Sequence, residues 1–264
     1  ANIQVFDADG IVPLRFEPLT GLHRVRCYFQ RPVSGAMQLW VSAMVRDEWG
    51  NGLDGNGDGS AGDNYVHTFH VTAPTGRVVS LPDFARGPGQ TVDVPAAATG
   101  LPISISDGAG VTRISVTLDY DWSAMHATGA TLAAGLPGDW TIAAIDLTTN
   151  GRAIITAEGA TALSAGPMQV IKLTADVPAD ATYGKGQALR LTNVSLNDGA
   201  IAATADLAVG KVAFFGDTTG DRSYSGDDAS LIARIVVGLD SGFDAYNLVD
   251  PMIVADVTGD GTLS

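Results

Sequence analysis

The sequence predicts a mainly β protein, in which an antiparallel β-sandwich follows a smaller β module and precedes a short α-helical segment. Two features of composition support this. The chain of 264 residues contains 32 glycines, and all but three of its 29 acidic residues are aspartate. Only three lysines occur, and lysine and glutamate are the usual residues of helix surfaces. Short alternating apolar and polar stretches between glycine, proline and asparagine turns are the third observation, and they favour strands.

The charge and hydropathy of the chain exclude several classes of function. Fifteen basic residues against 29 acidic ones give a net charge of −14, which argues against binding nucleic acid or an anionic membrane through general basicity. Hydrophobic residues make up 45% of the chain, enough to form a core. No apolar run approaches the ~20 residues that a membrane-spanning helix needs.

The first block, residues 1–78, is predicted to be a small β module. Arg24–Phe29 and Tyr65–Val71 have strand-like sequences, and a loop rich in glycine, aspartate and asparagine covers residues 50–64. Ala73–Gly76 is typical of a turn at a domain boundary. Cys27 is the only cysteine, so an intramolecular disulfide is excluded, and we expect it to be a small hydrophobic residue in a strand.

The second block, residues 79–212, is predicted to be the sandwich. Val111–Asp121 alternates apolar and polar residues, as expected of a half-buried strand. Eight or so short strands with turns every 10–15 residues indicate an antiparallel sandwich or jelly roll. The other expected strands are Gln90–Val94, Thr128–Leu132, Trp140–Ile145, Ala153–Ala157, Gln169–Ala175, Ala188–Leu196 and Ile201–Leu207.

The third block, residues 213–264, is predicted to contain the helix. Leu231, Ile232, Ile235 and Val236 fall on one helical face. We expect Asp227 or Asp228 to be the N-cap, because a carboxylate can accept a hydrogen bond from the first free backbone N–H groups of a helix. We expect Gly238 to follow the last turn, because glycine readily adopts the left-handed conformation found there.

An internal repeat in this block predicts calcium binding. Gly216–Ser225 and Ala255–Ser264 are identical at five of ten positions and lie 39 residues apart. Each copy has oxygen-bearing residues at alternate positions, as in an EF-hand-like loop. The expected first-loop ligands are Asp217, Thr219, Asp221, Ser223 (through its carbonyl), Ser225 and Asp228, and the expected second-loop ligands are Asp256, Thr258, Asp260 and Thr262.

The two loops differ in completeness. Arg222 occupies the sixth position of the first loop, where glycine is usual, whereas Gly261 occupies it in the second. The sequence stops at the ninth position of the second loop, so we expect its closing carboxylate and following helix to be missing. An aspartate-rich capped turn without an ion is the alternative interpretation for each loop.

A third candidate calcium loop lies in the first block. Gly59 stands at the sixth position, and Asp63 lies near the loop's end, although Tyr65 occupies the twelfth position. The expected ligands are Asp54, Asn56, Asp58, Ser60 and Asp63. A plain glycine- and aspartate-rich turn is the alternative.

These motifs resemble known families. Phe214–Ser264, with its duplicated loop, resembles a type I dockerin. The block around Val79–Val212 resembles a cohesin. The segments that carry this resemblance are Val92–Pro95, the Val111–Tyr120 strand and Thr128–Ala130. Arg46–Tyr65 resembles the last loop and strand of immunoglobulin-like modules in large secreted bacterial adhesins, of which residues 1–78 would be a partial copy.

The resemblance implies a non-catalytic, calcium-stabilised protein of the bacterial cell surface or exterior. It would assemble with other protein modules, including copies of itself joined head to tail as a scaffold, filament or surface layer. The alternative is a carbohydrate-binding or adhesive module, or an accessory region of a polysaccharide-degrading enzyme. A self-sufficient enzyme is disfavoured, because no nucleophile motif occurs and Asp119 and Asp121 fit a solvated strand edge better than an acid pair.

Overall fold

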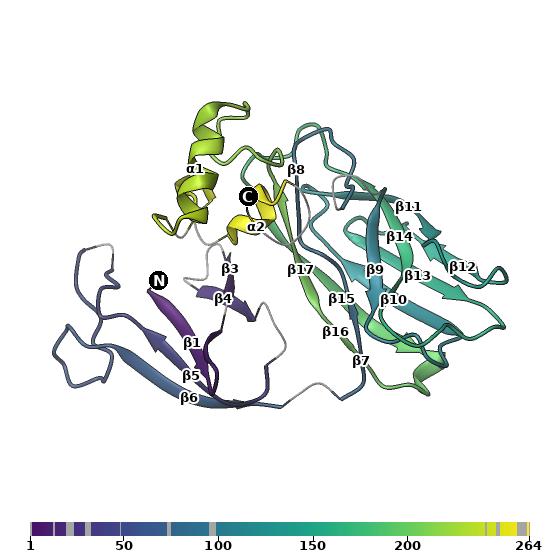
Figure 1. Ribbon diagram of the computed structural model, residues 1–264, viewed down its shortest axis with the longest axis horizontal. Coiled ribbons are helices and arrows are strands. Elements are labelled where there is room, and N and C mark those ends of the chain that lie inside the picture. Colours follow the sequence, from purple (N-terminus) through teal and green to yellow (C-terminus); the bar gives the residue numbers. More distant parts are fainter. Residues whose placement is uncertain are drawn as a thin grey trace. The chain divides into compact units, whose positions relative to one another are not determined.

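A computed structural model shows a mainly β protein, which confirms the predicted fold class (Figure 1). By contacts between Cα atoms, the chain divides into two compact units, Ala1–Ala73 and Pro74–Ser264. The structure describes residues 2–12, 14–19, 24–29, 33–47, 49–72, 75–94, 99–240, 242–246, 249–257 and 263.

The first unit is built on a four-stranded antiparallel sheet in the order β2-β1-β5-β6, with a separate hairpin of β3 and β4. Met37 of β5 pairs with Phe69 of β6, and Met37 is buried with Val5, Val12 and Val33 in a small core. The strands are β1 (Ile3–Asp7), β2 (Gly10–Val12), β3 (Leu14–Leu19), β4 (Arg24–Phe29), β5 (Gly35–Val41) and β6 (Tyr65–Val71). The expected strands Arg24–Phe29 and Tyr65–Val71 are therefore confirmed.

The second unit contains two sheets with a shared hydrophobic core (Figure 1). A six-stranded sheet has the order β12-β13-β10-β15-β17-β8, and a five-stranded sheet has the order β11-β14-β9-β7-β16. Their strands are β7 (Arg77–Ser80), β8 (Phe84–Arg86), β9 (Leu101–Ile105), β10 (Arg113–Asp119), β11 (His126–Leu132), β12 (Thr141–Asp146), β13 (Arg152–Glu158), β14 (Met168–Asp176), β15 (Gly186–Leu196), β16 (Ala203–Ala205) and β17 (Leu207–Val212).

The alternation of residues decides which side chains enter this core. In β10, Ile114, Val116 and Leu118 are fully buried, and the intervening positions carry polar residues. In the paired strand β13, Ala153, Ile155 and Ala157 are buried in the same way. Burial of each large apolar side chain contributes about 1.5–3 kcal/mol, so this core stabilises the sandwich.

Several expected strands differ from those observed. Gln90–Val94 does not form a full strand: Val92 N donates to Ala175 O at 2.8 Å and Gln90 O accepts from Val177 N at 2.9 Å, and at Asp93 the side chain bonds Gly100 N instead. Only Thr91 forms an isolated bridge, to Asp176. Ile201–Leu207 is divided between β16 and β17, which lie in different sheets. Strand β7 belongs to the second unit and spans the predicted limit at residue 78.

The chain after β17 forms helices α1 (Gly226–Val236) and α2 (Pro251–Ala255), with a short 3-10 turn at Asp244–Tyr246. Helix α2 was not expected. The core of this segment includes Ala85 of β8 and Val209 of β17, so it is continuous with the edge of the six-stranded sheet. No helix among the described residues is long and apolar enough to cross a membrane.

The ends of α1 follow capping rules. The N-cap is Ser225 rather than Asp227 or Asp228, which corrects the prediction. Ser225 has the extended backbone of a cap, and Asp228 is the third helical residue, whose carboxylate returns to the Ser225 backbone in a capping box. Gly238 has a φ of +75° and donates to Ile235 O, and Leu239 donates to Arg234 O, so the predicted glycine C-terminus is confirmed as a Schellman motif.

We expect Ser225→Ala to lower the free energy of unfolding by about 1 kcal/mol, because the cap oxygen on Asp227 N is lost. The measurement is urea unfolding in chelator, followed by helical circular dichroism. Ser223→Ala is the matched control, because its hydroxyl takes no part in the cap. Equal stability of the two variants would contradict the capping role.

Candidate functional site

The first predicted calcium loop is organised around Asp217. This residue follows β17 closely and is 0% exposed. Its Oδ1 accepts a hydrogen bond from Gly220 N at 2.7 Å, and its Oδ2 accepts one from Arg222 N at 2.8 Å. A buried carboxylate is costly unless it is hydrogen-bonded, so these bonds curl the loop around Asp217.

Thr219 links the two ends of this loop. Its Oγ1 donates to Asp217 Oδ1 at 3.2 Å, and its backbone N donates to Asp228 Oδ1 at 2.9 Å. Loop positions one, three and twelve are therefore brought together by direct bonds. Such an arrangement presents side-chain oxygens from both ends of the loop, as a hard cation such as calcium requires.

Asp228 is nearly fully buried, and its charge is supported by the loop. Its Oδ2 accepts hydrogen bonds from Ser225 N at 2.8 Å and Ser225 Oγ at 3.0 Å. Burial acts to raise the pKa of Asp228, but the hydrogen bonds from Thr219 and Ser225 outweigh it and lower the pKa. Asp228 therefore remains a carboxylate at neutral pH.

The remaining predicted ligands of the first loop lie nearer to solvent. Asp221 Oδ1 accepts a hydrogen bond from Ser223 N at 2.8 Å, and both residues are exposed. Among the described residues, the carboxylates of Asp217, Asp221 and Asp228 do not form a group with all ligand atoms within 4.8 Å. Thr219 therefore bridges the first and twelfth positions, but the three described carboxylates of this loop do not form one compact group of ligand atoms.

Arg222 shows how the chain accommodates a side chain at the sixth position. Its φ is +72°, in the left-handed region where glycine is favoured. Its guanidinium lies 5.1 Å from the centroid of the Tyr183 ring. A cation–π contact of this kind contributes about 0.5–1 kcal/mol at an exposed site, which offsets part of the backbone strain.

Tyr183 is a site residue that the sequence did not predict. Its hydroxyl donates a hydrogen bond to Asp217 Oδ2, and 34 residues separate the two. Burial, followed by the bond to Asp217, raises the pKa of Tyr183, so the hydroxyl keeps its proton. No local pattern marks a tyrosine in the turn between β14 and β15 as a partner of a distant loop.

The second loop starts where α2 ends. Asp256 is the C-cap residue of α2, and Gly216 N, just before the first loop, donates to Val254 O at 2.7 Å. The starts of the two repeats therefore lie side by side. The predicted ligands Thr258, Asp260 and Thr262 lie outside the described residues.

The loop of the first unit brings three carboxylates together. Ligand atoms of Asp54, Asp58 and Asp63 all lie within 4.8 Å of one another. Asp54 Oδ1 accepts from Gly57 N at 2.7 Å, and its Oδ2 accepts from Gly59 N at 2.8 Å. The curled backbone around Asp54 resembles that around Asp217.

The other residues of this loop support Asp58. Asp58 Oδ1 accepts from Ser60 N at 2.8 Å, and Asn56 Nδ2 donates to Asp58 Oδ2 at 3.1 Å. The hydrogen bond from Ser60 is the main cause of the lowered pKa of Asp58. Asp63 Oδ2 is buried and has no hydrogen-bond partner, which suits an oxygen reserved for a cation.

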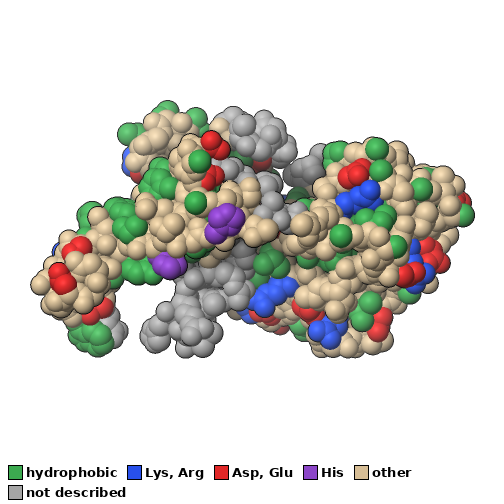
Figure 2. Space-filling model, turned by 90° about the horizontal axis from the view of Figure 1, so that it is seen from below, with side chains coloured by type: hydrophobic (Ala, Val, Ile, Leu, Met, Phe, Trp, Pro, Cys, Tyr) green, Lys and Arg blue, Asp and Glu red, His purple; other side chains and the backbone are tan. Residues whose placement is uncertain are grey.

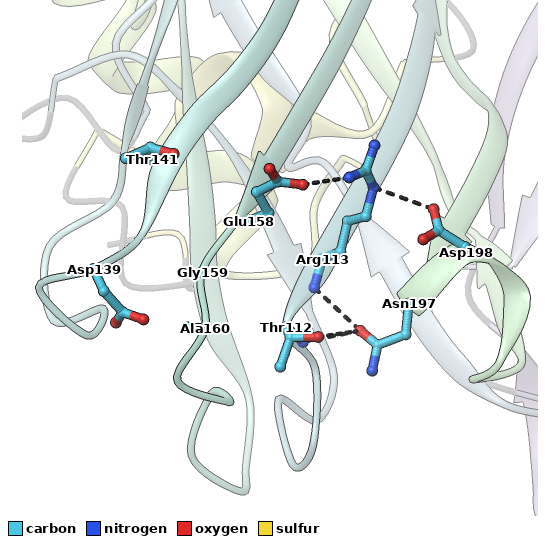
Figure 3. Close-up of a pocket in the computed structure, with 9 residues that line it drawn as sticks. All are labelled: Thr112, Arg113, Asp139, Thr141, Glu158, Gly159, Ala160, Asn197 and Asp198. Carbon is cyan, nitrogen blue, oxygen red and sulfur yellow. Dashed lines mark hydrogen bonds and ion pairs between the residues drawn. The ribbon is translucent and has the colours of Figure 1, made fainter.

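A polar pocket at the end of β10 and β13 is lined by residues that bind one another (Figure 3). Arg113 forms ion pairs with Glu158 and, from Nε at 3.1 Å, with Asp198 Oδ1. Asn197 Oδ1 accepts from Thr112 N at 2.9 Å. Asp139 Oδ2 is occupied by Thr161 N at 2.7 Å. These polar groups therefore connect neighbouring strands and loops to one another.

Asp119 and Asp121, weighed above as an acid pair, are both ion-paired. Asp119 Oδ1 accepts from Arg152 Nε at 2.7 Å, and Asp121 Oδ2 lies 2.6 Å from Lys185 Nζ. Figure 2 shows the same intermixing of acidic and basic side chains on one face of the second unit. Both aspartates are thus engaged by basic partners at the surface of the sandwich.

No protein-family model matches the chain, and no curated protein matches it. Similar solved structures include the sixth cohesin of scaffoldin B from Acetivibrio cellulolyticus, in complex with a dockerin (13% identity, TM-score 0.43, 52% of this chain and 99% of that chain). They also include the seventh type I cohesin of ScaB from Pseudobacteroides cellulosolvens (16%, 0.42, 52% and 92%) and a non-cellulosomal cohesin from the archaeon Archaeoglobus fulgidus (13%, 0.42, 52% and 91%). At these identities, function has to be inferred from this chain's own residues.

We expect Asp217→Asn to remove calcium-dependent stabilisation of the second unit. Binding only to the folded state stabilises by about 2.7 kcal/mol at a hundredfold excess of ion over Kd. Differential scanning calorimetry with and without calcium measures this. Asp227→Asn is the matched control, because its exposed carboxylate is outside the ligand set. An unchanged calcium response in Asp217→Asn would contradict the site.

For the first unit, we expect Asp63→Asn to lower the number of bound calcium ions by one in isothermal titration calorimetry. The physical reason is that the amide replaces the buried carboxylate oxygen that lacks a hydrogen-bond partner. Asp9→Asn, in the exposed turn between β1 and β2, should leave the stoichiometry unchanged. If Asp63→Asn binds as many ions as the parent, the loop is a plain turn.

Proposed function

We propose that the chain is a non-catalytic, calcium-stabilised part of an extracellular bacterial surface protein, which assembles through contacts with other protein modules. The observation that carries the calcium part is the buried Asp217 carboxylate joined through Thr219 to Asp228. Three oxygen-bearing residues converge there, and the sequence repeats the loop.

The donor chemistry supports calcium over softer metals. The candidate ligands of all three loops are carboxylate, hydroxyl, amide or carbonyl oxygens, and hard cations prefer such donors. The residues present therefore fit calcium, which would offset the repulsion among loop carboxylates. Extracellular modules bind calcium with Kd values of about 10⁻⁴–10⁻³ M, which suits the calcium concentration outside a cell. A secreted or surface location follows from this proposal.

The outer face of the six-stranded sheet is the proposed protein-binding surface. Along β10 and β13 this face carries the short side chains Ser115 and Thr156, whose hydroxyls are 3.1 Å apart. Ile154, at 39% exposure, lies next to them, and the Arg113–Glu158 and Arg152–Asp119 ion pairs border the face. An apolar centre surrounded by a polar, solvent-accessible rim is the usual layout of a protein interface.

We propose a second copy of this chain as the first partner to test. The net charge of −14 makes general attraction between copies unfavourable, so assembly would depend on a specific surface and on calcium. Head-to-tail contacts that do not close would generate filaments or layers.

A carbohydrate-binding function is the alternative, and one aromatic cluster favours it. Trp122 is 36% exposed, and its ring stacks on His126 with a centroid distance of 3.9 Å. The ring centroid of Tyr120, which is buried in the core of the sandwich, lies 6.5 Å from that of Trp122, so Trp122 alone would offer an exposed ring. Exposed aromatic faces bind sugar rings well. Loss of binding to an insoluble polysaccharide on Trp122→Ala would favour this function.

Light scattering after size-exclusion chromatography tests assembly. We expect multimers in millimolar calcium and a monomer near 27.1 kDa in chelator. Ile154→Asp should abolish the multimers, because it places a charge at the centre of the face. Thr131→Asp, exposed on the other sheet, is the control. A monomer under both conditions would overturn self-assembly.

A further inference from the structure

We infer that Tyr183 is a positioning residue for the first calcium loop, and that through it the loop and the sandwich form one cooperative unit. This inference rests on the proposed binding of calcium by that loop. It concerns a residue of the sandwich rather than of the loop itself. Under this inference, the loop and α1 are attached to the edge of the sheet and do not move independently of the sandwich.

The turn that carries Tyr183 is pinned to β17 directly ahead of the loop. Gly184 N donates to Val212 O at 2.7 Å, and Val212 N donates to Lys185 O at 2.8 Å. Ala181, on the other side of Tyr183, is buried in the core of the sandwich. The tyrosine backbone is therefore held between the core and the last strand.

The Tyr183 hydroxyl is bonded to the chain segment that follows β17, and it also interacts with the Tyr246 hydroxyl. It accepts a hydrogen bond from Phe214 N at 3.0 Å, and it donates its own proton to Asp217 Oδ2. Because the hydroxyl has only one proton, the bond from Phe214 directs that proton to the carboxylate. The ring also contacts the Phe214 ring, with 5.7 Å between centroids. The orientation of Asp217 is thus set by a side chain of the sandwich.

Arg222, in the loop, contacts both Asp217 and Tyr183. Its backbone N donates to the same oxygen of Asp217 that Tyr183 binds, and its guanidinium covers the Tyr183 ring. This gives a physical reason for arginine at the sixth position, where glycine would relieve the backbone. The side chain at this position holds the tyrosine against the carboxylate.

Further contacts fix the segment to the same edge of the sheet. The Arg86 guanidinium of β8 lies 5.3 Å from the Phe215 ring centroid, and Lys211 Nζ of β17 lies 5.3 Å from that of Tyr246. Gly220, inside the loop, has a φ of +75°, and a Cβ there would lie 2.8 Å from Ala245 Cβ. The loop is therefore packed on both sides, and an ion that orders it should also protect the sheet edge.

Partners that orient a metal ligand contribute 10–100-fold to metal affinity in well-studied sites. We therefore expect Tyr183→Phe to weaken calcium binding at this loop by about 10–100-fold, because Asp217 loses its fixed orientation. Isothermal titration in an Asp63→Asn, Asp256→Asn background isolates the loop from the two other candidate loops. Tyr120→Phe is the matched control, because Tyr120 is a sandwich tyrosine whose hydroxyl accepts a hydrogen bond from the backbone N of Ala127 rather than contacting Asp217.

The outcomes separate the two proposals. If the parent shows no calcium binding that Asp217→Asn removes, the proposed calcium function and this inference both fail. If the parent binds and Tyr183→Phe binds equally well, the inference alone is overturned. A Kd raised in Tyr183→Phe and unchanged in Tyr120→Phe supports it.

Amide hydrogen exchange of the unsubstituted chain is a second measurement. It tests the coupling between the loop and the sandwich even if Tyr183→Phe does not fold. We expect calcium to slow exchange at the amides of Gly184 and Val212, in the sandwich, as well as within the loop. Protection of the loop alone would overturn the coupling.

Discussion

The burial of the Asp217 carboxylate is the constraint on which the C-terminal half of the second unit depends. Burying a carboxylate is costly unless it is paired or hydrogen-bonded. Here those bonds come from the loop backbone at Gly220 and Arg222, from Thr219, and from the sandwich through Tyr183. The loop conformation, the start of α1 and the attachment to β17 all follow from satisfying one buried group.

The sandwich provides the rigid support for this arrangement. Its two sheets bury continuous apolar faces, and the edge formed by β8 and β17 presents Ala85 and Val209 to the C-terminal segment. The buried residues of that segment form one cluster with Ala85 and Val209, so its core is shared with the sheet edge. The first unit repeats the chemistry on another scaffold, where Asp54 organises a loop and Asp63 retains a buried oxygen without a partner.

Much of the fold could be predicted because period-two alternation is a local property. It located β10, β13, β14 and β15, in which buried apolar residues recur at every second position over most of each strand. Strands β7 and β8 are too short to show a period, and Pro102 obscures β9. Helix α2 has a single turn, and its signals, Asp250 as N-cap and Pro251 at the first position, are brief.

The candidate sites divide in the same way. Asp217, Thr219 and Asp228 could be singled out because the spacing of a calcium loop is a feature of one short stretch of sequence. In the structure Thr219 contacts both aspartates, as that spacing predicts. The role of Ser225 as N-cap was hidden by the aspartates beside it. Tyr183 could not be found from sequence, because its partner is brought near only by the pairing of β15 with β17.

Anomalous diffraction from crystals grown in calcium would show whether Asp217 and Asp228 hold an ion. We expect a peak at about 2.3–2.6 Å from oxygens of Asp217 and Asp228, with the Tyr183 hydroxyl still bound to Asp217. Well-ordered loop density without a peak, at millimolar calcium, would contradict it, because the buried carboxylates would then be satisfied by hydrogen bonds alone.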